Sequence, residues 1–208
     1  MTDKKGLIVC FDGPDGIGKT TQLKLTEASL VNEGYDVFTA KAIGGLPITD
    51  ILGRALMMNE DRPPETDLHV AIASQYALAQ EILPRRDKGQ VVLLDRSPLS
   101  IIAYQVYADK LSSEAGDKAV KELLDLIKPD LIITYYANED VIKDRRSTRN
   151  GKSDLDFFEG KPQEYHSQVA EGFKAAAKDY GASSIDASAP IELVREATMQ
   201  LIGAKLKA

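Results

Sequence analysis

The sequence predicts an α/β fold in which a doubly wound, parallel, five-stranded sheet is flanked by helices. Residues 13–20 read Gly-Pro-Asp-Gly-Ile-Gly-Lys-Thr, which fits the pattern G-x-x-x-x-G-K-[ST]. This motif lies between an apolar run at 7–11 and a stretch with helical periodicity at 19–32. Further along the chain, apolar runs keep alternating with helix-like stretches. These observations indicate a P-loop NTPase fold with its ligand at the carboxyl ends of the strands.

The first half of the chain divides at recognisable breaks. The continuous apolar run predicts a strand at 7–12 that is buried on both faces, and Gly34 ends the helix that follows. A second strand is predicted at 35–41, and a short helix runs from the turn at residues 44–47 to about residue 58. The prolines at 63 and 64 end that segment, so Thr66 is the expected N-cap of the next helix.

The helix at 68–83 has an apolar set at helical spacing and many alanines, which predicts burial on more than one side. The members of that set are Leu68, Ile72, Tyr76, Ala79 and Leu83. The third strand, 90–95, ends in Asp95, where the catalytic edge of a doubly wound sheet is expected. Helices are predicted through Tyr104 and again at 113–127.

The last third of the chain continues the alternation. A fourth strand is predicted at 130–135, a helix at 138–146, a long helix at 162–180 and a short strand at 183–186. Pro190 is expected in the first turn of the terminal helix. The polar, charged stretch from about 146 to 160 reads as a lid.

Composition limits the class of protein. The chain has 208 residues and no Pro-, Ser- or Gly-rich linker, which predicts one domain over residues 1–208. A net charge of −6 gives no general attraction to nucleic acid or to an anionic membrane. No apolar run is long enough to span a bilayer, the N-terminus does not read as a signal peptide, and Cys10 is the single cysteine. We therefore expect a cytoplasmic protein that binds neither nucleic acid nor membrane.

The glycine-rich motif has a definite chemistry. Its glycines let successive backbone N–H groups turn toward a phosphate, and the following helix adds the positive end of its dipole. Lys19 is then expected to reach the β- and γ-phosphates of a nucleotide, and the Thr20 hydroxyl to ligate Mg²⁺. The alternative is a glycine-rich turn between strand and helix that binds no ligand.

Five stretches carry a resemblance to a known family. They are FDGPDGIGKTTQ at 11–22, VVLLDRSPLSIIAYQ at 91–105, the arginines of the 145–149 segment with DFFE at 156–159, YHSQVAEGF at 165–173 and SSIDASAP at 183–190. With these features the chain resembles, over nearly its whole length, the thymidylate kinases, which are P-loop nucleoside-monophosphate kinases. The resemblance implies ATP as phosphoryl donor, Mg²⁺ as cofactor, a nucleoside monophosphate as acceptor and a homodimeric assembly.

The resemblance also implies roles for individual residues. The expected catalytic residues are Lys19, Asp95, Arg96, Arg145 and Arg149, and the expected metal ligands are Thr20 and Asp95. The expected ATP-binding residues are Gly13, Asp15, Gly16, Gly18, Lys19, Thr20, Thr21, Asp186 and Ala187. The expected acceptor-binding residues are Asp15, Lys41, Arg54, Val70, Ser74, Arg96, Ser97, Ser100, Tyr104 and Gln105.

The acceptor side departs from the family pattern. The family shows Arg-Glu-Pro-Gly-Gly-Thr after the second strand, where this chain has Lys-Ala-Ile-Gly-Gly-Leu at 41–46. Counting back from Pro84, Val70 replaces a base-stacking phenylalanine and Ser74 replaces an arginine that grips the acceptor phosphate. Ser97 replaces a tyrosine. We expect Lys41 and Arg54 to compensate, and activity on dTMP to be low or shared with other monophosphates.

The sequence therefore predicts an ATP- and Mg²⁺-dependent kinase that converts dTMP to dTDP. Two alternatives stay open at this point. One is a kinase for another nucleotide or a nucleoside, and the other is a P-loop ATPase that acts as a switch or binding protein.

Overall fold

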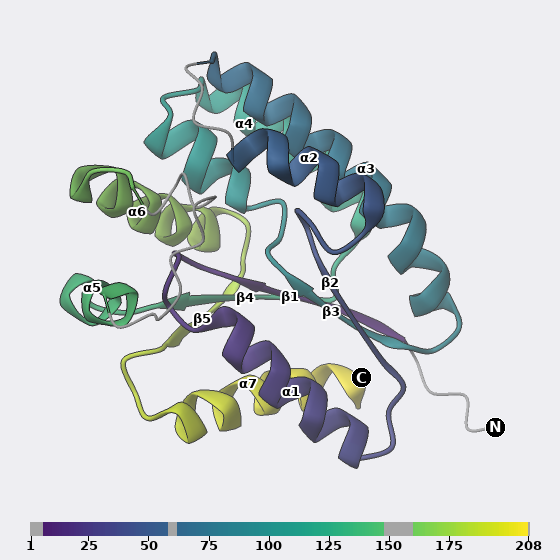
Figure 1. The fold of residues 1–208 in the computed structure, drawn as a ribbon. Helices are drawn as coiled ribbons and strands as arrows, with labels where there is room; N and C mark the ends of the chain where they lie inside the picture. The colour runs from purple at the N-terminus through teal and green to yellow at the C-terminus, as the bar shows by residue number, and fades with distance from the viewer. Residues whose placement is uncertain (1–5, 58–61, 148–159, 208) are drawn as a thin grey trace.

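A computed structural model describes residues 6–57, 62–147 and 160–207. Five parallel strands form one sheet in the order β2-β3-β1-β4-β5, as Figure 1 shows. The strands are β1 (Leu7–Asp12), β2 (Val37–Lys41), β3 (Val91–Asp95), β4 (Leu131–Tyr136) and β5 (Ser183–Asp186). Asp95 is in register with Phe11 on one side and Lys41 on the other. The carboxyl ends of the three strands therefore meet at one edge of the sheet.

Helices cover both faces of the sheet (Figure 1). They are α1 (Lys19–Asn32), α2 (Pro47–Met57), α3 (Pro64–Asp87), the π-helix η1 (Ile102–Ala108), α4 (Ser113–Ile127), α5 (Glu139–Ser147), α6 (Gln163–Asp179) and α7 (Ile191–Leu206). Because side chains alternate along a strand, Val9 and Phe11 pack toward α1 and α7, whereas Ile8 and Cys10 pack toward α3 and α4. None of the described helices is long and apolar enough to cross a membrane.

The predicted fold class is confirmed, and the predicted elements shift at a few ends. The second strand begins at Val37 instead of residue 35, because the Tyr35 N–H donates to the Leu30 carbonyl oxygen at 3.0 Å and closes the end of α1. Pro190 is the N-cap of α7 and not a residue of its first turn. The predicted lid lies mostly in residues 148–159, outside the described residues.

The helix α3 is longer than predicted. It begins at Pro64, with Pro63 as N-cap, so the N-cap assignment to Thr66 is wrong. A proline fits the first turn, where its missing N–H has no helical partner to lose. The helix also runs past Pro84 to Asp87, and the Lys88 N–H still donates to the Pro84 carbonyl oxygen at 3.2 Å.

The buried face of α3 also differs from the predicted one. Tyr76, predicted to be buried, is 44% exposed and its hydroxyl donates to Glu122 at 2.6 Å. The face that packs inward includes Leu68, Ala71, Ser74, Gln75, Leu78 and Ile82. Alanines occur on several sides of the helix, and alanine is tolerated both in the core and at the surface. The sequence therefore does not show which face of α3 is buried.

The π-helix η1 was predicted as an ordinary helix. Its wider turn is of a kind often found beside functional sites. It packs closely against α6 at Gly172, where a Cβ atom would lie 2.6 Å from the Ala103 Cα atom. The close approach buries Tyr104, whose ring meets Phe173 edge-on at 5.9 Å.

This contact generates a prediction about stability. Gly172→Ala forces η1 away from α6, so we expect the free energy of unfolding to fall by about 1–3 kcal/mol in urea titration. The control is Gly203→Ala in α7, where an added Cβ atom meets nothing within 4 Å. That change is expected to raise stability by about 0.5–1 kcal/mol through helix propensity. Equal effects of the two substitutions on the free energy of unfolding would contradict close packing between η1 and α6 at Gly172.

Candidate active site

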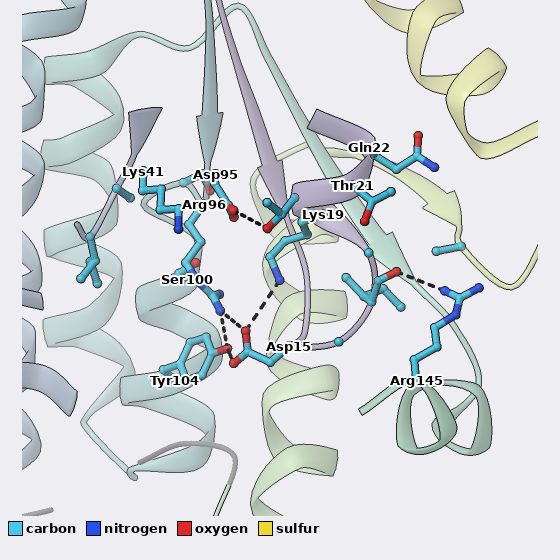
Figure 2. A pocket seen from close by; sticks show the side chains of 18 of the residues that line it. Asp15, Lys19, Thr21, Gln22, Lys41, Asp95, Arg96, Ser100, Tyr104 and Arg145 are labelled. Carbon is cyan, nitrogen blue, oxygen red and sulfur yellow. Dashed lines mark hydrogen bonds and ion pairs between the residues drawn. The ribbon is translucent and has the colours of Figure 1, made fainter. Parts of the chain in front are cut away.

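A cavity of about 560 Å³ opens at the carboxyl edge of β1, β2 and β3. The P-loop, the ends of β2 and β3, α3, the segment leading into η1, α5 and the start of α7 supply its walls (Figure 2). This is the place where open parallel sheets bind ligands, since the loops that follow the strands diverge there.

The P-loop forms one wall of the cavity. Gly13 has φ of 134°, and a Cβ atom there would lie 2.5 Å from the Tyr135 carbonyl oxygen, so only glycine fits. Gly18 caps α1 with φ of 106°. The Lys19 Nζ atom donates to the carbonyl oxygens of Gly13 and Pro14, both at 2.8 Å. The loop thus places an ammonium group and a helix N-terminus at the cavity, which is the arrangement that binds phosphate.

Thr20 and Asp95 bring two oxygen ligands together beside the P-loop. The Thr20 hydroxyl donates to Asp95 Oδ2 at 2.8 Å, and both residues line the cavity. One hydroxyl and one carboxylate fit Mg²⁺, which prefers hard oxygen ligands and takes the rest from water and substrate phosphates. In agreement, the described ranges hold no cluster of three or more His, Cys, Asp or Glu side chains suited to a metal.

Arg96 directly follows β3 and lies beside Asp15, the acidic residue of the P-loop. Its backbone is held at φ of 80° while its N–H donates to the Phe11 carbonyl oxygen at 2.8 Å. Its Nη2 atom pairs with Asp15 and donates to the Tyr104 hydroxyl at 3.0 Å, and that hydroxyl donates to Asp15 at 2.7 Å (Figure 2). The Nη1 atom is buried without a hydrogen-bond partner among the described residues. A buried donor without a partner costs free energy, so a small shift of the guanidinium would let it pair with an anionic ligand in the cavity.

Asp12 is a site residue that the sequence reasoning missed. This fully buried carboxylate accepts hydrogen bonds from the N–H groups of Gly13 and Ser97, both at 3.1 Å, and from the hydroxyls of Ser97 and Ser100. It thereby ties the start of the P-loop to the segment after Arg96. A carboxylate closing an apolar strand just before the first P-loop glycine was the available signal, because such a group needs several donors.

The charged groups of the site and their burial shift the pKa values of Lys19, Asp15 and Asp12. Burial, helped by the charge of Arg96, lowers the pKa of Lys19 to about 8. For Asp15 burial acts in the raising direction, but the charges of Arg96 and Lys19 outweigh it and hold the pKa below its ordinary value. Burial raises the pKa of Asp12 despite its hydrogen bonds. The site therefore concentrates cationic charge where phosphates would lie.

Most of the predicted site residues meet at this cavity. Those in its wall are Asp15, Gly16, Gly18, Lys19, Thr20, Thr21, Lys41, Asp95, Arg96, Ser97, Ser100, Tyr104, Gln105, Arg145 and Ala187. The Arg145 guanidinium donates to the Ile17 carbonyl oxygen at 3.2 Å from α5 (Figure 2). Arg149 lies outside the described residues. Gly13 and Asp186 do not line the cavity. Gly13 is buried, whereas Asp186 is exposed and accepts a hydrogen bond from the Ser188 N–H.

Three residues expected to bind the acceptor are not in the wall that the described residues form around the cavity. Ser74 is fully buried, and its hydroxyl donates to the Ala42 carbonyl oxygen at 2.7 Å. Val70 is the residue one turn earlier, on the same side of α3, and Arg54 is exposed on α2. From α3 the cavity instead receives Ala71 and Gln75. A step of one residue rotates a helix by about 100°, so a count along the sequence selected the neighbouring side of the helix.

The fold and this site together define a class of protein. A P-loop with its lysine and its Thr20–Asp95 pair faces, within one cavity, an arginine with an open donor. This is the arrangement of a P-loop kinase that joins two phosphate-bearing ligands, as nucleoside-monophosphate kinases do.

Comparison with known proteins agrees. The family model for thymidylate kinase matches residues 11–198. Relatives named thymidylate kinase include those of Caldanaerobacter subterraneus, 37% identical over 85% of this chain and 84% of the relative, and of Thermoanaerobacter, 34% identical over 85% and 86%. Another, from Geobacillus thermodenitrificans, is 31% identical over 97% and 92%. The chain belongs to the thymidylate kinase family.

The lowered pKa of Lys19 predicts a pH profile. Below pH 8 the charged form of the free enzyme predominates, and it is lost as pH rises through about 8. Since kcat/KM reports the free enzyme, kcat/KM for ATP should fall above that pH. The kcat value should stay level there, because bound phosphates raise the pKa of the lysine. Lys19→Arg keeps its charge, so a descent near pH 8 in that variant would assign the titration to another group.

Proposed function

We propose that this protein transfers the γ-phosphoryl group of ATP to dTMP, giving dTDP and ADP. The observation that carries the proposal is the shared cavity, whose wall holds both the P-loop and Arg96, and the Nη1 donor of Arg96 has no partner among the described residues. Membership of the thymidylate kinase family supports dTMP as the acceptor.

The chain's own groups divide the work. Lys19 and the P-loop N–H groups bind the β- and γ-phosphates, and Arg96 binds the acceptor phosphate through Nη1. An oxygen of the acceptor phosphate attacks the γ-phosphorus in line, the bond to the β-phosphate oxygen breaks, and ADP leaves without a covalent enzyme intermediate. Asp15 accepts a hydrogen bond from a sugar hydroxyl of the acceptor. Thr20 and Asp95 would hold Mg²⁺, which would supply neutralisation of phosphate charge when bound.

The remaining positive charge comes from the last turn of α5 and the segment that follows it. Arg145 lines the cavity at the P-loop, and we propose that it and Arg149 neutralise the transferring group as the lid, about residues 146–160, closes. The P-loop has glycine at position 16, so the loop itself offers only Lys19 as a cation. A basic residue from elsewhere in the chain is therefore required.

The test is an assay of ADP release with ATP, Mg²⁺ and a panel of ribo- and deoxyribonucleoside monophosphates. We expect dTMP to be phosphorylated and Lys19→Ala to lower kcat at least about a hundredfold, since the lysine stabilises charge present mainly in the transition state. Lys24→Ala, an exposed lysine of the same helix, is the control and should leave kcat unchanged. ADP release without an acceptor would favour the ATPase switch, and preference for a nucleoside would favour a nucleoside kinase.

We also propose a cytoplasmic homodimer, as the family resemblance implies. The helix α2 leaves Ile48 and Ile51, about one turn apart, 50% and 63% exposed. Apolar side chains that gather on one helix suit a two-fold contact between copies of the chain. A cytoplasmic location accords with the use of ATP and a nucleoside monophosphate.

The assembly generates a prediction. Ile51→Glu places a charge on the proposed interface, so light scattering at micromolar concentration should change from a dimer mass to a monomer mass. Val31→Glu, at an equally exposed valine of α1, is the matched control and should leave the dimer intact. A monomer mass for the wild-type protein would contradict the proposed homodimer.

A further inference from the structure

Gln75 presents a buried carboxamide that the mechanism above does not use. It lies on the inward face of α3, is only 5% exposed and lines the cavity. Its Oε1 atom is buried and, within the part of the chain that the structure describes, has no hydrogen-bond partner. An unpartnered buried acceptor costs free energy, so the group is suited to meet an N–H donor on a ligand.

The surroundings of Gln75 suit a flat, mostly apolar ring. Ala71 lines the cavity one helical turn earlier on the same face of α3. The helix α2, which packs on α3, adds Leu56 and Met57 to the wall. Gln75 thus combines a hydrogen-bonding edge with neighbouring apolar surface, which is how a ligand pocket fixes orientation and still gains from burial.

The neighbouring Ser74 of α3 is already engaged in a hydrogen bond within the protein. The Ser74 hydroxyl donates to the Ala42 carbonyl oxygen and lies outside the cavity wall. It therefore holds the strand end in place, while the Gln75 side chain lines the cavity.

We propose that Gln75 is a specificity-determining residue that reads the edge of a 4-oxopyrimidine base. The inference rests on the proposed function and names the base-recognition group of that same site. Oε1 accepts the N3–H of the base and Nε2 donates to O4, a paired contact that a carboxamide makes with any edge offering a donor beside an acceptor. Cytosine presents the reverse order, an acceptor at N3 beside a donor at N4, so it could pair only with the carboxamide turned over, which would move Oε1 out of its buried position.

The experiment compares dTMP with its N3-methyl derivative and with dCMP in the full-length protein. The variants are Gln75→Leu, which is similar in size but apolar, and Gln75→Asn, which keeps the amide on a side chain that is one methylene shorter. Gln80→Leu, at an exposed glutamine of α3, is the matched control. Steady-state kinetics give KM and kcat for each acceptor, calorimetry gives Kd for dTMP, and thermal unfolding checks the fold.

We expect Gln75→Leu to lower kcat/KM for dTMP about 10- to 100-fold, mostly through KM, with the KM for ATP unchanged. The wild-type preference for dTMP over its N3-methyl derivative and over dCMP should shrink at least about tenfold in Gln75→Leu and in Gln75→Asn. The Gln80 control should keep both the dTMP constants and the preferences.

Two results would overturn the inference, and they differ from each other. A wild-type enzyme that phosphorylates dTMP, with Gln75 variants that keep its KM and its preferences, removes the role of Gln75 alone. A wild-type enzyme that neither binds nor phosphorylates dTMP removes the proposed function together with it.

Discussion

The candidate site depends on one buried carboxylate, that of Asp12. Its four hydrogen bonds join the first glycine of the P-loop to the segment that follows Arg96. They add to two other links between the loops, the hydrogen bond from the Arg96 N–H to the Phe11 carbonyl oxygen and the Arg96–Asp15 ion pair. With them, the loop that binds donor phosphates and the arginine proposed for the acceptor phosphate keep a fixed separation. Fixed separation is what a reaction between two bound phosphates requires, because its rate depends steeply on their alignment.

Sequence reasoning reached the sheet and the donor half of the site because local rules govern both. The strand at 7–12, the helix at 19–32 and the motif between them follow from apolar runs, glycine conformations and helix periodicity. The pairing of Thr20 with Asp95 as metal ligands was implied by the family resemblance, and the two side chains are hydrogen-bonded in the structure. These features need little knowledge of how distant segments pack.

The acceptor half was predicted less well because it depends on helix rotation and packing. Ser74 and Val70 were chosen by counting residues, whereas the inward face of α3 is set by contacts with α2, α4 and η1. Alanine-rich stretches carry little periodic signal, and the π-turn of η1 has no signature in the sequence. The importance of Gln75 and Asp12 follows only from the structure. Gln75 has a buried oxygen without a hydrogen-bond partner among the described residues, and buried Asp12 accepts several hydrogen bonds.

The division of the cavity between sheet and helix has an evolutionary consequence. The phosphate-handling groups stand on β1, β3 and the loops bound to them, whereas the α3 wall is carried by a helix that contributes only Ala71 and Gln75 to the cavity. Under the acceptor role proposed above for α3, substitutions on that face would exchange one acceptor for another while the phosphate chemistry stays intact. A lineage can therefore drift in acceptor preference and remain a working phosphotransferase at every step, which fits a chain whose P-loop follows the family pattern and whose acceptor motifs do not.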